Sequence, residues 1–174
     1  MTTLLLVRHG ETDWNAVGRL QGHTDRPLNA FGREQAKALA ARLADETEDV
    51  AAIYSSDLSR ARETAEILGE RLGLPVVVDA DLRERNWGNW EGLTSEERLR
   101  VVFEGESREE HRERTLRAIE RIVERHEGQR VVVVTHGGSL RRLQAAVSGV
   151  ASSVIDNCSV YRLAHRDGAF RPVD

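Results

Sequence analysis

The sequence predicts an α/β fold of three layers, in which a mostly parallel central sheet with an antiparallel edge strand lies between two layers of helices. Short runs of leucine and β-branched residues alternate along the chain with longer amphipathic patterns, as expected when helices connect parallel strands. No segment rich in Pro, Gly or Ser divides the 174 residues, and no repeat of fixed period is visible. We therefore expect residues 1–174 to form a single domain.

The apolar runs predict five strands. Val131–Thr135 is the most apolar, so we expect it near the centre of the sheet, buried on both faces. Val160–Ala164 is the last run and is expected at an edge, where pairing across a two-fold axis would give a homodimer. The predicted strands are Thr2–Val7, Val50–Tyr54, Val76–Asp79, Val131–Thr135 and Val160–Ala164.

Helical patterns fill most of the chain between these strands. Asn29 is a good N-cap for the first helix, and Gly73 is a good stop for the second. The third predicted helix is strongly charged, and the fourth comes at the pair Gly137-Gly138. The predicted helices are 29–43, 57–72, 107–126 and 137–147, whereas 82–92 is irregular. The apolar faces of the first three are Phe31, Ala36, Leu39, Ala40 and Leu43; Leu58, Ala61, Ala65 and Leu68; and Leu116, Ile119, Ile122 and Val123.

Composition excludes several classes of protein. Charged residues make up 31% of the chain, but the net charge is −4, which excludes the basic surface of a nucleic-acid-binding domain. A single cysteine, Cys158, excludes an intramolecular disulfide and a zinc site of paired cysteines, and it is most simply a small core residue. No apolar run approaches the ~20 residues needed to cross a membrane, and no secretory signal is visible. We therefore expect a cytoplasmic protein without a membrane or nucleic-acid partner.

Two segments of the chain have the same pattern. Leu4–Gly10 and Val131–Gly137 each consist of an apolar strand that ends in histidine followed by glycine. Because ligands bind at the carboxyl ends of parallel strands, His9 and His136 are expected to meet there. Glycine allows the chain to approach a ligand closely, and the helix after Gly137 directs its N–H groups at the same point, an arrangement suited to phosphate.

Other strand ends add further groups to the same point. Arg8 precedes His9, Arg60 lies in the first turn of the helix after the second strand, and Glu84 follows the third strand. Since guanidinium groups bind phosphate oxygens in a forked geometry, two arginines and two imidazoles predict a pocket for a phosphoryl dianion.

Less specific interpretations remain open. Each histidine could close its strand with a main-chain hydrogen bond, and Arg60 could be a solvated surface charge. His9, His136 and Glu84 could hold a metal ion, although the neighbouring arginines would repel it. Trp87 and Trp90 are either core residues or walls of the pocket. The glycine-rich nucleotide-binding loops and the Gly-x-Ser-x-Gly nucleophile motif are absent.

These residues resemble the histidine phosphatase superfamily, in its phosphoglycerate mutase-like branch. The resemblance covers nearly the whole chain in the family's order, and its motifs together are highly specific. They are Leu6–Thr12, Trp14–Asn15, Gly18–Gly22, Asp25–Leu28, Gly32, Tyr54–Ala61, Thr64–Ala65, Leu82–Glu84, Gly88, Trp90–Gly92, Gly105–Ser107 and Thr135–Gly138.

The resemblance implies a role for each site residue. His9 would attack phosphorus and become a phosphohistidine, while Arg8, Arg60 and His136 would hold the phosphoryl oxygens. Glu84 would protonate the leaving alkoxide and then take a proton from water. Pocket hydrogen bonds would come from Asn15, Gln21, Gly22 and the Gly137 N–H. The family requires no metal.

These roles make demands on protonation. His9 must present a neutral ring nitrogen, which neighbouring positive charge favours and which a main-chain contact must orient. Glu84 must be protonated for its first task, although free carboxyl groups titrate near pH 4.3. We therefore expect Glu84 to be partly buried, with a bound phosphate dianion raising its pKa.

The family divides according to the acceptor of the phosphoryl group. Mutases of this branch, which are primed by 2,3-bisphosphoglycerate, carry basic residues in a longer insertion after the glutamate motif. Here that stretch is only Leu93–Glu104, and Arg98 and Arg100 do not match the mutase spacing. The sequence therefore favours a phosphatase of small phosphomonoesters that needs no cofactor. A phosphoglycerate mutase, an α-ribazole phosphatase and a non-catalytic phosphate-binding module remain the alternatives.

Overall fold

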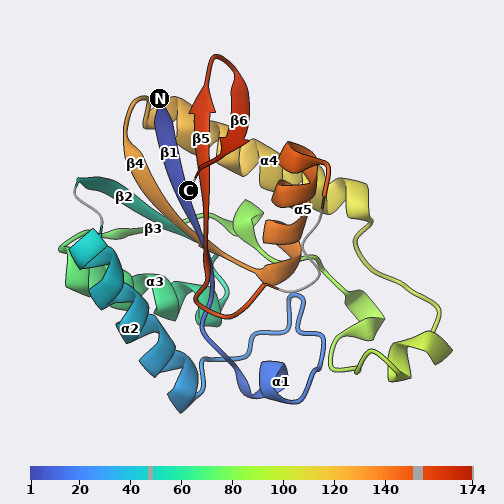
Figure 1. Ribbon diagram of the computed structural model, residues 1–174. Coiled ribbons are helices and arrows are strands. Elements are labelled where there is room, and N and C mark those ends of the chain that lie inside the picture. Colours follow the sequence, from blue (N-terminus) through green and yellow to red (C-terminus); the bar gives the residue numbers. More distant parts are fainter. Residues whose placement is uncertain (47–48, 151–154, 174) are drawn as a thin grey trace.

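The computed structural model describes residues 1–46, 49–150 and 155–173, and a six-stranded sheet lies at the centre of this part of the chain (Figure 1). The strand order is β3-β2-β4-β1-β5-β6; the first four of these pair in parallel, and β5 and β6 are antiparallel. The predicted fold class is confirmed. The strands are β1 Thr2–Arg8, β2 Val50–Ser55, β3 Val76–Val78, β4 Arg130–Thr135, β5 Val160–Arg166 and β6 Ala169–Pro172.

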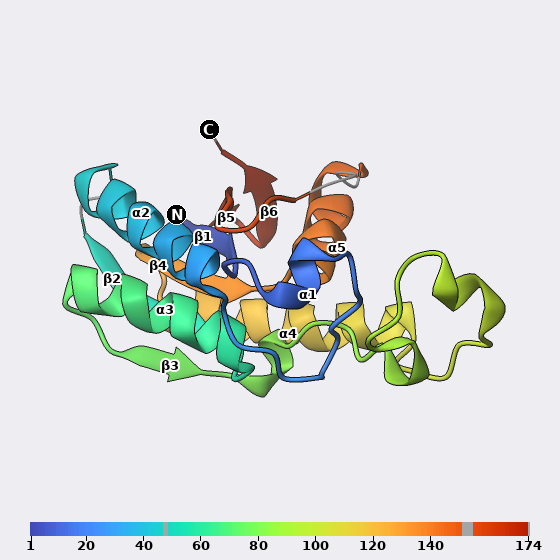
Figure 2. The ribbon, with the colours of Figure 1, turned by 90° about the horizontal axis from the view of Figure 1, so that it is seen from below.

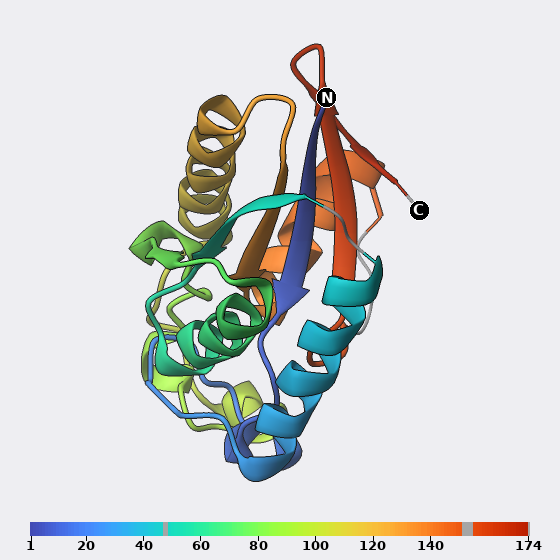
Figure 3. The ribbon, with the colours of Figure 1, turned by 90° about the vertical axis from the view of Figure 1, so that its left-hand side faces the viewer.

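Helices cover both faces of the sheet (Figure 3). Alternate residues of β1 explain the three layers: Leu4 and Leu6 pack in the core beneath α4 and α5, whereas Leu5 and Val7 pack in the core beneath α2 and α3. The α-helices are α1 Asp13–Ala16, α2 Ala30–Glu46, α3 Ser59–Leu72, α4 Arg108–Arg125 and α5 Gly137–Ser148. The Asn29 side chain accepts a hydrogen bond from the Gly32 N–H (2.7 Å), and Gly73 ends α3 with φ of 69°.

The strand predicted to be central is central. β4 lies between β1 and β2, and the side chains of Val131–Val134 are fully buried. Because β1 and β4 run side by side in parallel, Arg8 pairs with Thr135 in the register of the sheet. This register brings the residues that follow the two strands, His9 and His136, to the same edge.

The prediction that Val160–Ala164 is an edge strand is wrong. β5 pairs with β1 on one side and with β6 on the other, so its hydrogen-bonding groups are not free for a second chain. β6 was not predicted because it is short and lacks an apolar run. It follows Asp167-Gly168, whose positive φ angles of 53° and 76° form a tight hairpin turn.

Three smaller predictions are also corrected. Phe31 is 60% exposed rather than part of the apolar face of α2, because it lies five residues before Ala36 and so about 140° round the helix from it. The third strand ends at Val78 instead of Asp79, and α3 begins at Ser59 instead of Asp57.

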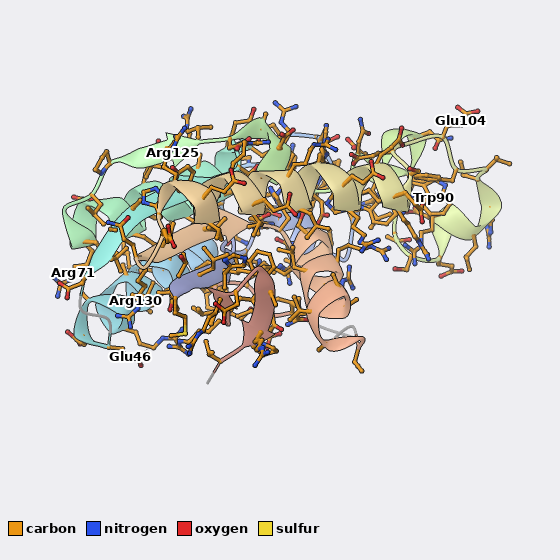
Figure 4. The ribbon with its side chains drawn as sticks, turned by 90° about the horizontal axis from the view of Figure 1, so that it is seen from above. Glu46, Arg71, Trp90, Glu104, Arg125 and Arg130 are labelled. Atoms are coloured by element: carbon orange, nitrogen blue, oxygen red, sulfur yellow. The ribbon has the colours of Figure 1, made fainter. Side chains whose placement is uncertain are left out.

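The chain between β3 and α4 extends beyond the sheet (Figure 2). It contains the irregular segment predicted from the sequence, and Figure 4 shows Trp90 and Glu104 at the end of the molecule remote from Glu46 and Arg71. Its short 3₁₀ helices are η1 Ala80–Leu82, η2 Gly88–Trp90 and η3 Glu97–Arg100. Across the described residues, no helix combines the length and the apolar character needed to cross a membrane.

Candidate active site

The predicted site residues meet at the carboxyl ends of β1, β2 and β4, around a pocket of about 260 Å³. His136 is the exception: it lies behind the pocket wall, fully buried, with its ring centroid 5.1 Å from that of His9. The predicted residues that line the pocket are Arg8, His9, Asn15, Gln21, Gly22, Arg60, Glu84 and Gly137.

The structure fixes the tautomer of His9. Its Nδ1 lies 2.7 Å from the carbonyl oxygen of Gly10, and because a carbonyl only accepts, Nδ1 must carry the proton. Nε2 then keeps its lone pair. Burial, together with the positive charges of Arg60 and Arg8, holds the pKa of His9 well below its usual 6.5, so the imidazole is neutral at physiological pH.

Arg60 is a buried cation rather than a surface charge. Its side chain is 1% exposed, and its two terminal nitrogens donate to the carbonyls of Thr24 (3.1 Å) and Gly22 (2.7 Å). Burial lowers its pKa to about 10, which still leaves it charged at neutral pH. Arg8 is anchored in the same way, by a hydrogen bond to the carbonyl of Ile155.

Several buried nitrogens around His9 have no partner in the described part of the chain. They are Nε of Arg8, Nε of Arg60 and both ring nitrogens of His136. Since buried polar atoms are almost always hydrogen-bonded, a cluster of unpartnered N–H groups of this kind suits an anion with several oxygens. Burial and the charge of Arg60 hold the pKa of His136 well below 6.5, so its ring is neutral and carries one N–H.

Glu84 is held by two main-chain N–H groups. Its Oε1 accepts from Arg85 and its Oε2 from Gly138, each at 2.8 Å. The side chain is 13% exposed, so the predicted partial burial is confirmed. A side chain at position 138 would place its Cβ 2.2 Å from the carboxylate, which explains why glycine stands there.

This arrangement can be compared with known proteins. The family model of the histidine phosphatase superfamily (branch 1) matches residues 4–174. The chain belongs to this superfamily.

The relatives of this chain have names of two kinds, phosphatases and a phosphoglycerate mutase. A metal-independent phosphoserine phosphatase of Arabidopsis thaliana is 39% identical over 171 residues, covering 88% of this chain and 71% of the relative. A "probable phosphoglycerate mutase GpmB" of Escherichia coli is 36% identical over 188 aligned positions, covering 96% and 86%. A mycobacterial glucosyl-3-phosphoglycerate phosphatase solved with VO₃ has a TM-score of 0.86 and 33% identity, covering 98% of this chain and 96% of that chain.

The remaining predicted site residues also line the pocket. Asn15 Oδ1 and Thr12 form a reciprocal cap at the start of α1, and Gln21 accepts a hydrogen bond from Thr12 (2.8 Å). Gly22, with φ of 54°, supplies the carbonyl that holds Arg60. Gly137 lies against the Arg8 side chain. In the first turn of α5, the N–H of Gly138 donates a hydrogen bond to the Glu84 carboxylate.

Sequence reasoning missed several residues of the pocket wall. Trp87 lines the pocket, as one of its two interpretations expected, whereas Trp90 does not line it and stacks on Trp87 with ring centroids 6.1 Å apart. Arg141 lies one turn after Gly137 on α5, a helical spacing from which its position could have been inferred. The lining residues not predicted are Arg19, Leu20, Gly138, Arg141 and Ile155.

Arg114 of α4 also escaped prediction, although it positions Glu84. It donates to the carbonyls of Arg83 (2.8 Å) and Glu84 (2.7 Å), and its Nε lies 2.6 Å from a carboxylate oxygen of Glu106. No local signal could reveal this contact, because 30 residues separate Arg114 from Glu84.

Two other expectations concern metal and thiol chemistry. Among the residues that the structure describes, no group of three or more His, Cys, Asp and Glu side chains is placed to hold a metal ion. Cys158 is packed against the core beneath α2 and α3, as predicted, and burial raises its pKa to about 12.

Proposed function

We propose that the protein hydrolyses small phosphomonoesters, without a metal ion, through a phosphohistidine on His9. The observation that carries the proposal is a cluster of buried nitrogens without hydrogen-bond partners in the described residues. These nitrogens belong to Arg8, Arg60 and His136, and they accompany His9, whose Nε2 keeps its lone pair. Fixed cations and N–H donors of this kind stabilise the charge that spreads over three oxygens during phosphoryl transfer.

The reaction then has two balanced steps. In the first, the Nε2 lone pair of His9 forms the N–P bond while the ester P–O bond breaks, and the proton of the Glu84 carboxyl group passes to the leaving oxygen. In the second, a water oxygen forms a new P–O bond as the N–P bond breaks, and Glu84 takes the water proton. Inorganic phosphate and the alcohol are the products.

The surroundings of the pocket favour water as the acceptor. Arg98 and Arg100, the basic residues of the short stretch after the glutamate motif, do not line the catalytic pocket. Arg98 lies over the ring of Trp90 (5.6 Å), and Arg100 is exposed beside Glu96 (3.9 Å). The mutase, which a relative's name suggests, is the alternative, and in that case 2,3-bisphosphoglycerate would act as the phosphoryl primer.

Turnover assays test this proposal. The purified protein is expected to release phosphate from 4-nitrophenyl phosphate in the presence of a metal chelator, and His9→Ala is expected to be inactive. Absence of turnover would show that the pocket only binds phosphate. With 3-phosphoglycerate and a trace of 2,3-bisphosphoglycerate, the proposal predicts free phosphate, whereas 2-phosphoglycerate as the main product would identify a mutase.

A further inference from the structure

A second cavity opens next to the catalytic pocket. It measures about 280 Å³ and shares Glu84, Trp87, Gly138 and Arg141 with the catalytic pocket. Beyond these shared residues its wall is basic, and we call it the arginine pocket. It is defined by Arg85, Arg98, Arg108, Arg141 and Arg142.

These arginines come from three parts of the chain. Arg108 begins α4, Arg142 lies on α5, and Arg85 belongs to the segment that extends beyond the sheet. The guanidinium of Arg85 lies against the rings of Trp87 (4.6 Å) and Phe103 (4.5 Å), its Nε donates to the carbonyl of Glu106, and the residue is only 7% exposed. The pocket wall is therefore built from fixed groups as well as surface side chains.

The arginines of the arginine pocket make no close ion pairs, although Glu84 lines the same cavity and Glu109 acts on Arg85 and Arg142 at longer range. In residues 1–46, 49–150 and 155–173, none of its five arginines lies within 4.0 Å of a carboxylate, whereas Arg83, Arg114 and Arg121 each form an ion pair. Burial and the charges of Arg108 and Arg141 lower the pKa of Arg142. Mutual repulsion of this kind, in a chain of net charge −4, is relieved when an anion binds.

The position of Glu84 relates this cavity to the reaction. In the proposed mechanism Glu84 protonates the leaving oxygen, so the leaving group lies on the side of Glu84 that faces away from His9. The arginine pocket shares Glu84 with the catalytic pocket but is not lined by Arg8, His9 or Arg60, so it lies beyond Glu84 from the groups that would hold the phosphoryl group. The carboxylate of Glu84 repels an anion close to it, so an anionic part of the leaving group would lie farther out, toward Arg108 and Arg142.

We infer that the leaving group of the substrate carries a second phosphate group, which the arginine pocket binds. This inference rests on the proposed function, because it uses the direction in which the leaving group departs. The charge of the pocket favours a phosphate dianion over a carboxylate, because one negative charge leaves most of the unpaired arginines uncompensated.

Binding of non-hydrolysable ligands tests the inference separately from catalysis. The probes are propane-, butane- and hexane-diphosphonate, with the alkylphosphonate and the phosphonocarboxylate of each chain length, measured by titration calorimetry. For the chain length that binds best, we expect the Kd of the diphosphonate to be about tenfold or more below that of the alkylphosphonate. The diphosphonate should also bind more tightly than the phosphonocarboxylate of the same length.

Variants then assign the effect to the pocket. The double variant Arg108→Gln/Arg142→Gln is expected to lose most of the gain from the second phosphonate, whereas Arg117→Gln, an exposed change on the opposite side of α4, should keep it. Thermal melting and alkylphosphonate binding check that the double variant is folded.

Three results would overturn the inference: less than about threefold gain at every chain length in the unaltered protein, a carboxylate that binds as well as the second phosphonate, or a gain that survives in the double variant. Failure of the proposed function is seen separately, as absence of phosphate release from any ester while diphosphonate binding is retained.

Discussion

At the scale of single residues, main-chain contacts and burial set the reacting groups in their working states. The Gly10 carbonyl selects the tautomer of His9, and the N–H groups of Arg85 and Gly138 orient the Glu84 carboxylate. In the proposed mechanism these contacts suit each group to one role: His9 supplies a lone pair, and Glu84 exchanges protons on the leaving-group side.

Replacing the charge of Arg60 should change the titration of His9. Because Arg60 helps to hold the pKa of His9 below 6.5, Arg60→Gln should raise that pKa, and the imidazole should become protonated at higher pH. An NMR titration of the His9 ring carbon-bound protons measures this directly. Arg62→Gln, an exposed change on the same helix, is the control. An unchanged or lower midpoint in Arg60→Gln would be evidence against the charge coupling.

The proton-donor role of Glu84 predicts a dependence on the leaving group. Glu84→Gln should lower kcat on alkyl phosphates by about 10²- to 10⁴-fold, since an alkoxide needs a proton to leave. With 4-nitrophenyl phosphate, whose leaving group is stable as an anion, the loss should be much smaller. The ratio of the two rates measures the role. Equal losses on both substrates would show that Glu84 acts mainly in binding.

At the scale of structural elements, the site depends on loops that are held together by long-range contacts. Glu91 of the segment beyond the sheet accepts hydrogen bonds from the main-chain N–H groups of His23 (2.8 Å) and Thr24 (2.8 Å), next to the carbonyls that hold Arg60. Arg114 of α4 similarly fixes the main chain at Glu84. The helix and the two loops therefore position the cation and the acid together.

Loss of Arg114 should affect both stability and catalysis. Its ion pair with Glu106 is mostly buried, with 13% and 14% of the two side chains exposed. Arg114→Met leaves Glu106 without its cation and should lower the free energy of unfolding by about 3–5 kcal/mol in urea titrations. The alkyl-to-aryl rate ratio should also fall, because Glu84 loses its anchor. Arg117→Met, an exposed change on α4, is the control, and a matching small effect in both variants would contradict this account.

Elements with local sequence signals were predictable, whereas elements that depend on long-range contacts were not. The strands that end in His9 and His136 were predictable because apolar runs and the His-Gly pairs are local signals. β6 was not, because its short run, Ala169–Pro172, has no apolar pattern and depends on the Asp167-Gly168 turn. The arginine pocket could not be predicted either, since Arg85 and Arg142 approach each other only when a loop packs beside α5.

At the scale of the whole molecule, the burial of three histidines links stability to pH. Burial lowers the pKa values of His9, His111 and His136 in the folded protein, whereas the unfolded chain binds protons at these groups near pH 6.5. Stability is therefore fully present above that pH and falls as the pH drops below it.

The size of this effect can be measured by urea unfolding between pH 7.5 and pH 5.5. Each of the three histidines should contribute a slope of up to about 1.4 kcal/mol per pH unit below its unfolded pKa. His136→Gln should reduce the slope by removing one of them. A free energy of unfolding that stays constant or rises over this range on acidification would contradict the burial of neutral imidazoles.

The parallel sheet brings residues from the two ends of the chain to one point, and the central claim is that His9 becomes phosphorylated there. The direct test is to stop turnover of 4-nitrophenyl phosphate in alkaline denaturant and to map the phosphoryl group by peptide mass spectrometry. We predict one acid-labile phosphoryl group per chain, on the peptide that contains His9, and none in His9→Ala. A phosphoryl group on another residue, such as His136, or full activity of His9→Ala would contradict the account.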